Sequence, residues 1–137
     1  GFARVGKELR AGNVSVGGSL EAEICFAEKV RVGGRVETQR GTKSKLFEIG
    51  RHGKVTGPVV AEQVEVHDHA ELEDIYADLL VMGKHSSAHN VYAKRAVLNS
   101  GCKISGELVY TQELELGERL GLSYEPKKVE KLPEPPI

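Results

Sequence analysis

The sequence lacks the features that mark several common protein classes. It has no tryptophan, 16 glycines and abundant valine, a composition that points away from a helical bundle. Its two cysteines, Cys25 and Cys102, are too few for a disulfide-built scaffold and fit a reducing, cytoplasmic setting. No apolar run approaches the length of a transmembrane helix, and no signal peptide is visible. Because the chain starts at Gly1 and not at Met, the sequence leaves open whether another segment precedes it.

The net charge is also close to zero. The chain has 19 basic and 20 acidic residues, for a net charge of -1. Proteins that bind nucleic acids usually carry a basic excess on one face, so no nucleic-acid partner is expected. The GxGxxG spacing of a phosphate-binding loop occurs nowhere, and there is no serine nucleophile elbow.

One segment repeats along the chain with a period of 16 residues. It begins at Val59, and its apolar positions return from Ile75 and from Val91. Within each short run the apolar residues alternate, which is the period of a β-strand with one buried face. The aligned columns are Val59/Ile75/Val91, Ala61/Ala77/Ala93, Val64/Leu80/Ala96, Val66/Met82/Leu98 and Leu72/Ala88/Ile104.

The same register extends towards both ends with a period of 16 or 17 residues. The matching sets are Leu9, Ala11, Val14 and Val16; Ile24, Val30 and Val32; Phe47, Ile49 and Val55; and Leu108, Leu114 and Leu116. The sets that begin at Ile24 and Leu108 carry one inserted residue. Residues 38–45 interrupt the register, so a loop is predicted there.

Two further columns are rich in glycine and asparagine. One contains Gly57, Asp74, Asn90 and Gly106, and the other contains Gly17, Gly33, Gly50, His67, Gly83, Asn99 and Gly117. Gly, Asn and Asp tolerate positive φ, so the first column predicts a tight bend once per turn. The second column predicts another bend at the same spacing.

These columns predict an all-β fold, a right-handed parallel β-helix of about seven turns of 16–17 residues formed by a single chain. A left-handed β-helix usually shows a hexapeptide repeat, which does not fit this spacing. The alternative is a mixed α+β domain, because residues 70–82 are good helix formers with apolar residues near helical spacing. That alternative explains one segment and none of the columns. We expect a β-helix domain over residues 1–118, followed by a cap and a proline-rich, disordered tail over residues 119–137.

The glycine-marked segments resemble a known family. Residues 14–20 read Val-Ser-Val-Gly-Gly-Ser-Leu, and residues 30–36 read Val-Arg-Val-Gly-Gly-Arg-Val. These units and the short turn resemble the bactofilins, polymer-forming cytoskeletal proteins of bacteria and archaea, over about residues 9–117. The resemblance implies a β-helical core that polymerises end to end without nucleotide, often near a membrane, and it carries over no catalytic residues. The middle turns depart from the pattern, with Asp-His-Ala at residues 68–70 and Lys-His-Ser at residues 84–86 where relatives commonly have glycine.

The histidines are the strongest candidate for a chemical site. His52, His69 and His85 share one column, and His67 lies two residues from His69. Neighbouring turns lie about 4.8 Å apart, and zinc takes three or four N or S ligands. However, the column faces outward at a bend, and its members do not converge on one point. We therefore expect an exposed polar ladder, with a metal site formed by His67, His69 and His85 as the alternative.

The cysteines are expected to be structural. Cys25 has the offset of Tyr76 and Tyr92, so its side chain is predicted to point outwards, while Cys102 shares the column of Ser86. The two lie four turns apart, about 19 Å along the stack. This separation excludes a disulfide within the chain, because that bond needs Cα atoms within about 7 Å.

Two functions from different classes remain. The first is a structural scaffold that is not an enzyme, needs no cofactor and binds copies of itself through its terminal turns, whose strand edges are unpaired. The alternative is an enzyme built on a β-helix that uses the histidine cluster. A partner of the proline-rich tail and association with a membrane stay open. The predicted self-assembly residues are Leu9, Val14, Val16 and Leu20 at one end and Leu108, Leu114 and Leu116 at the other; Leu120, Leu122 and Tyr124 are candidates for a cap.

Overall fold

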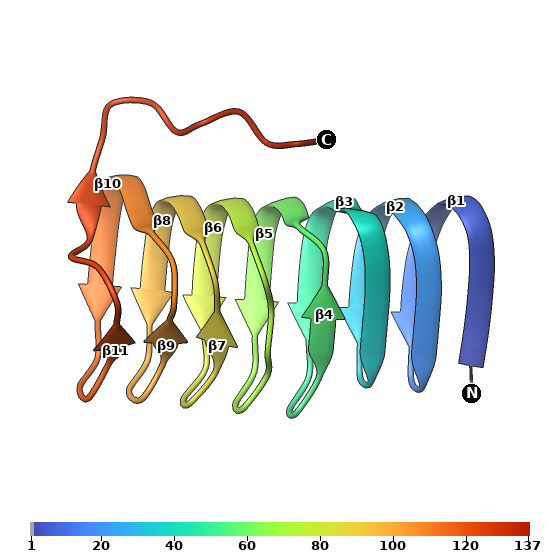
Figure 1. The fold of residues 1–137 in the computed structure, drawn as a ribbon, viewed down its shortest axis with the longest axis horizontal. Coiled ribbons are helices and arrows are strands. Elements are labelled where there is room, and N and C mark those ends of the chain that lie inside the picture. Colours follow the sequence, from blue (N-terminus) through green and yellow to red (C-terminus); the bar gives the residue numbers. More distant parts are fainter. Residues whose placement is uncertain (1) are drawn as a thin grey trace.

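The computed structural model describes residues 2–137, with side chains beyond residue 5, and all regular structure in that part is β. The strands β1, β2, β3, β5, β6, β8 and β10 pair in parallel in this order, each one turn after the last, and β12 follows β10 (Figure 1). Residues 2–137 contain no helix that could cross a membrane. The strands are β1 (Phe2–Val16), β2 (Ser19–Val32), β3 (Arg35–Ile49), β4 (Lys54–Thr56), β5 (Val59–Val66), β6 (Ile75–Met82), β7 (Ser87–Ala88), β8 (Val91–Leu98), β9 (Lys103–Ile104), β10 (Leu108–Leu116), β11 (Gly121–Leu122) and β12 (Lys127–Lys128).

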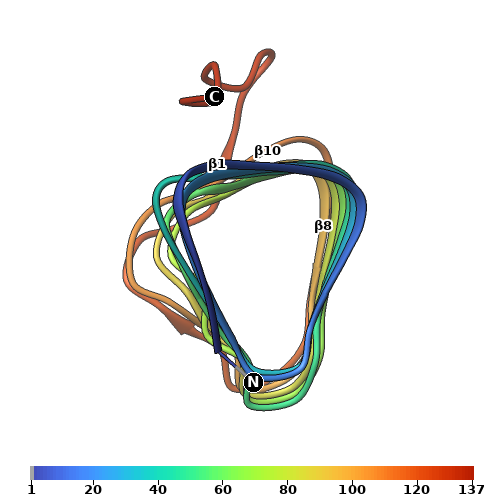
Figure 2. The ribbon, with the colours of Figure 1, turned by 90° about the vertical axis from the view of Figure 1, so that its right-hand side faces the viewer.

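The coil is a triangular prism, and it is right-handed, as predicted. Viewed from the N-terminal end, the chain turns clockwise as it recedes (Figure 2). The first face holds the start of β2 and β3 together with β4, β7, β9 and β11. The second face comprises residues 24–27, 42–44, 59–61, 75–77, 91–93 and 108–110. The third face comprises residues 29–32, 46–49, 63–66, 79–82, 95–98 and 113–116.

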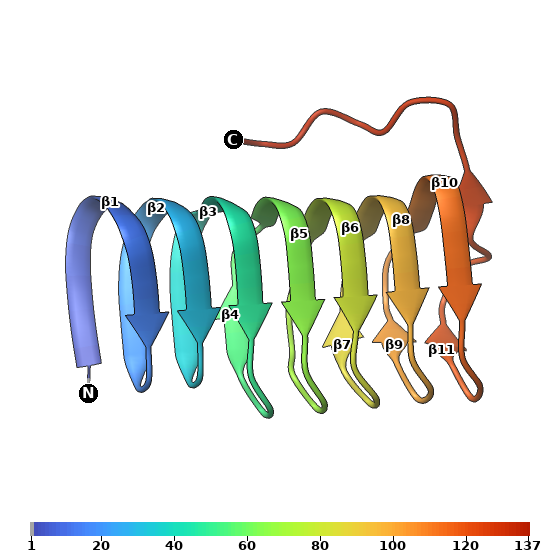
Figure 3. The same ribbon diagram turned by 180° about the vertical axis from the view of Figure 1, so that it is seen from behind.

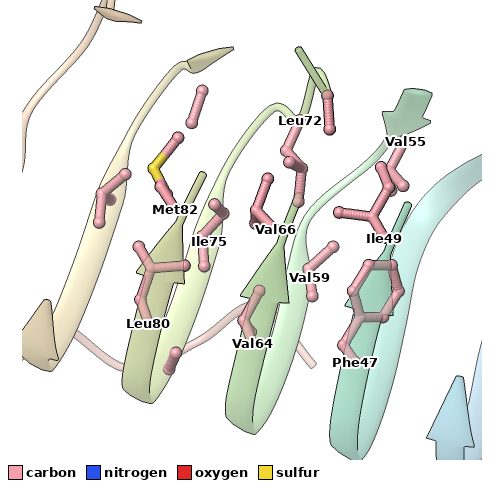
Figure 4. Packing of buried hydrophobic residues seen from close by; sticks show 14 of the residues in the cluster. Phe47, Ile49, Val55, Val59, Val64, Val66, Leu72, Ile75, Leu80 and Met82 are labelled. Atoms are coloured by element: carbon pink, nitrogen blue, oxygen red, sulfur yellow. The ribbon is translucent and has the colours of Figure 1, made fainter. Parts of the chain in front are cut away.

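Alternation of side chains explains both the core and the corners. In β5, Val59, Ala61, Val64 and Val66 are buried, while the residues between them are not. The alternation breaks at Glu62 and Gln63, where two successive residues face outward and the strand bends from the second face to the third. The predicted columns are confirmed by the pairing, which places Val64 on Leu80 and Leu80 on Ala96. Figure 4 shows these columns filling the interior turn after turn.

The predicted loop over residues 38–45 is wrong. This segment lies within β3, and Thr38, Thr42 and Ser44 are buried. Thr42 pairs with Val59 and Ser44 with Ala61, so both hydroxyl residues occupy inward positions of the second face. The corner before them is turned by Gly41, whose φ is 118°. A search for apolar alternation misses this turn because its inward positions carry hydroxyl groups.

The predicted bend at Gly57, Asp74, Asn90 and Gly106 exists, but its basis differs from the prediction. Only Gly57 has a positive φ, at 86°. Asp74 and Asn90 instead use their side chains, because Asp74 Oδ1 accepts the Asn90 N–H at 3.1 Å and Asn90 Oδ1 accepts the Glu107 N–H at 2.8 Å. These side chains therefore extend the backbone hydrogen bonding from turn to turn around the corner.

Candidate functional site

The N-terminal end of the coil is an open strand edge. β1 pairs with β2 on one side, and no strand within residues 2–137 pairs with its other side. Of the predicted assembly residues at this end, Leu9 and Val14 are partly buried against the core. Val16 is 8% exposed and Leu20 6% exposed, so both belong to the core. A partner would therefore meet the backbone edge of β1 together with Leu9 and Val14.

The C-terminal end is closed on two of its three faces. β11 pairs with β9 and extends the first face, and β12 pairs with β10 at Val109 and Tyr110 and extends the second face. Together they form two sides of an incomplete eighth turn. The third face ends with residues 113–116, which no strand among residues 2–137 covers.

The predicted residues at this end differ in exposure accordingly. Leu108 is 1% exposed, whereas Leu116 is 45% exposed and Leu114 is partly buried against the core. Leu120 and Leu122 also pack against the core, as a cap requires, while Tyr124 is 63% exposed. The open surface at this end is therefore the edge that carries Leu114 and Leu116.

The histidines form a stacked ladder on the outside of the bend after the third face. The rings of His52 and His69 lie 5.2 Å apart at 10°, and those of His69 and His85 lie 5.2 Å apart at 16°. All three are exposed, as expected for a polar ladder. Parallel rings direct their nitrogen lone pairs side by side and not towards a common point, so stacking works against a shared metal ion.

His67, the remaining member of the alternative metal site, has a different partner. Its Nε2 lies 3.1 Å from Glu48 Oε1, one turn earlier on the third face. Within residues 2–137, no group of three or more His, Cys, Asp or Glu side chains is arranged to hold a metal ion. The residues His67, His69 and His85 are thus neighbours in the coil without forming a converging ligand set.

The backbone at this ladder shows a feature that the sequence columns did not reveal. His52, His69 and His85 have φ values of 59°, 60° and 58°, and the next two turns have Gly101 at 79° and Arg119 at 56°. One residue per turn therefore adopts the left-handed conformation, in which His, Asn and Asp are enriched among the non-glycine residues. In the sequence, Gly101 in the same column is the feature that indicates this conformation. This requirement gives the histidines a structural role in the bend.

The prediction for Cys25 is wrong, and so is the alignment of Ile24 with the inward column through an inserted residue, because Ile24 pairs with Gly41 at the corner. The pairing of β2 with β3 shifts by one residue between Ala22 and Ile24, so that Cys25 pairs with Thr42 and enters the inward column of Val59. Its side chain is 1% exposed, and burial raises the pKa of the thiol to about 11. Cys102 lies in its predicted column, with Sγ 3.4 Å from Ser86 Oγ. Both thiols are free, as predicted from their separation.

Comparison with known proteins adds no relative to this description. No protein-family model, curated protein or solved structure matches the chain.

Proposed function

We propose that this chain is a structural protein that assembles end to end, as the resemblance of its glycine-marked turns to bactofilins implies. The observation that carries the proposal is the open third-face edge at residues 113–116, opposite a fully open edge at β1. Unpaired backbone groups at such an edge recruit another strand unless something covers them. Joining two ends gains backbone hydrogen bonds and buries apolar side chains at the same time.

The two ends present complementary surfaces for such a joint. β1 provides 15 residues of parallel strand edge that runs around all three sides of the prism. The C-terminal end provides Leu116, 45% exposed, beside the partly buried Leu114. No ligand or nucleotide is needed in this mechanism, since the adhesive surface is the continuation of the core itself.

Analytical ultracentrifugation of the full chain tests the proposal. We expect large assemblies for the wild type and much smaller species for Leu116→Lys, because a charge at the joint would have to be buried without a partner. The matched control is Leu79→Lys, which makes the same change on an outward position of the third face in the middle of the coil. Assembly of the control should equal that of the wild type.

The size of the small species reports the polarity of the joint. Monomers are expected if the N-terminal end binds the C-terminal end, and dimers if like ends join. Leu116→Lys protein that assembles like the wild type would refute the proposal. Replacing His52, His69 and His85 together by Asn, which also tolerates positive φ, should leave assembly unchanged.

A further inference from the structure

The outward side of the second face carries an apolar and aromatic row. Pairing aligns Phe26, Lys43, Val60, Tyr76, Tyr92 and Val109 on successive turns. The rings of Tyr76 and Tyr92 stack with centroids 4.8 Å apart at 22°. Val109 is only 6% exposed although it faces away from the core. The outward positions at the next corner differ from this row, because Glu62, Asp78 and Lys94 are charged and exposed.

The C-terminal segment lies over this face. It joins the coil at β12, where Lys127 pairs with Val109, and Val129 N–H donates to the Tyr110 carbonyl at 2.9 Å. It then turns back and runs along the outside of the prism towards the N-terminal end (Figures 1 and 3). Figure 2 places it outside the same side of the triangle as β10. At its end, Ile137 Cδ1 lies 3.3 Å from the position that a Cβ would take on Gly41.

The segment has the chemistry of a polyproline II ligand. Four of the five prolines of the chain, Pro126, Pro133, Pro135 and Pro136, lie in it. Proline fixes φ near −65° and holds the preceding residue extended, so such a segment loses little entropy on binding. Pro126, Val129 and Leu132 are half-buried while the residues between them are exposed. This spacing of three equals the period of a polyproline II helix.

The two tyrosines of the row, Tyr76 and Tyr92, are half-buried. Desolvation raises the pKa of Tyr76 and, together with the hydrogen bond from Tyr92 Oη to Glu107 Oε2 at 3.0 Å, raises the pKa of Tyr92 to about 12. At the N-terminal end of the row, Phe26, Lys43 and Val60 are among the residues that line a hollow. Surfaces that present aromatic side chains are the usual receptors for proline-rich segments, and this row presents Phe26, Tyr76 and Tyr92.

We propose that the row of Val60, Tyr76, Tyr92 and Val109 is a docking site for proline-containing extended segments, and that residues 126–137 occupy it within the same chain. The ligand class is a polyproline II peptide with an apolar residue at every third position. The tail thereby blocks the site against ligands from outside. This proposal is independent of end-to-end assembly, because the row lies on the side of the coil and not at its ends.

Binding of a fluorescently labelled peptide with the sequence of residues 125–137 tests the site. The full chain is prepared as wild type and as a tail-released variant with Val129→Asp, Leu132→Asp and Ile137→Asp. A control variant changes exposed tail positions, Glu130→Asp, Lys131→Asp and Glu134→Asp. We expect saturable binding, measured by fluorescence anisotropy, to the tail-released variant and little binding to the other two, since a tethered tail competes at an effective concentration of about millimolar. Adding Tyr76→Ser and Tyr92→Ser to the tail-released variant should lower its affinity for the peptide by more than about tenfold, because the two aromatic rings carry much of the contact area.

Trypsin cleavage after Lys128 and Lys131 provides a second measurement on the full chain. We expect several-fold faster cleavage in Tyr76→Ser/Tyr92→Ser than in wild type, and no change in Tyr124→Ser, whose ring is already exposed. Three results would overturn the proposal: no peptide binding to the tail-released variant although its β-rich circular dichroism is intact, equal binding to wild type, or equal cleavage in all variants. A dimer in sedimentation that forms only when the tail is present would show that the tail binds the row of a second chain and not that of its own.

Discussion

Single residues set the shape of each bend in this coil. After the third face, His52, His69, His85, Gly101 and Arg119 all take positive φ, so the same turn recurs five times with different side chains. For a residue other than glycine this conformation costs roughly 1–2 kcal/mol. The histidines lie at these positions with their rings stacked on one another, and the ring of His85 occupies the place that a Cβ on Gly101 would take. The backbone conformation and the ring stacking together explain why histidine suits these positions.

Gly101→Ala should be among the most harmful small substitutions. The new methyl group would meet the His85 imidazole and would be held at a φ of 79°. We expect a loss of about 1–2 kcal/mol or more in the free energy of unfolding, measured by urea denaturation. Gly17→Ala is the control, because no atom lies within 4 Å of the added methyl group. Equal stability of the two variants would contradict the structural role of Gly101.

Tyr92 makes the stability of the fold depend on pH in the alkaline range. Its pKa is raised from an ordinary value of 10 to about 12 in the folded state, chiefly by desolvation. The folded protein therefore holds this proton more tightly than the unfolded chain does, so stability is full below pH 10 and falls as the pH rises from 10 to about 12. Tyr92→Phe should remove part of this decline and the late step in a titration followed by tyrosinate absorbance. An unchanged titration would show that Tyr92 is not the shifted group.

At the scale of the strands, two features build the core: side chains alternate between inward and outward along each strand, and equivalent side chains stack from turn to turn. Each inward side chain of β5, β6 and β8 rests on the equivalent side chain of the neighbouring turn, as Val66, Met82 and Leu98 do. The outward neighbours Val81 and Val97 also pair, but they are only half-buried. The free energy of burial therefore resides mainly in the inward columns.

Leu80→Ala and Val81→Ala test this division within one strand. Leu80 is fully buried, so its truncation should lower the free energy of unfolding by about 2–5 kcal/mol through lost burial and a cavity. Val81 faces outward and is half-buried, so its truncation should cost less than about 1 kcal/mol. Thermal or urea unfolding compares them. The opposite order of stabilities would mean that the strand is shifted by one residue.

The turns that the sequence predicts best are those whose inward positions are all apolar. Val59, Ile75 and Val91 align by residue type alone, and the pairing confirms them. The third turn is harder to recognise, because Thr42 and Ser44 take inward positions that only the neighbouring turns identify. Hydrophobicity assigns Cys25 to the wrong side because the apolar Ile24 beside it is also buried and is mistaken for the member of the inward column. The path of the tail could not be predicted at all, since its partner residues are distant in the sequence.

The whole molecule is asymmetric along its axis. The N-terminal end presents an uncovered strand over residues 2–16, whereas β11 and β12 cover two faces of the C-terminal end. The tail then leaves the end and runs back along the second face (Figure 3). The open strand edges therefore lie at the ends, where the proposed assembly would grow, and the side carries the tyrosine row. The proposed assembly and the proposed binding of extended segments therefore use different surfaces.

Electron microscopy of the wild-type chain tests the proposed assembly most directly. If coils join end to end, the protein should form unbranched filaments one coil wide. Because parallel turns lie about 4.8 Å apart, this spacing should run along the filament axis. Single particles of the length of one coil, at the highest concentration at which the protein stays in solution, would contradict the proposal. Filaments whose 4.8 Å spacing runs across their axis would contradict it equally, because their subunits would then join through their sides.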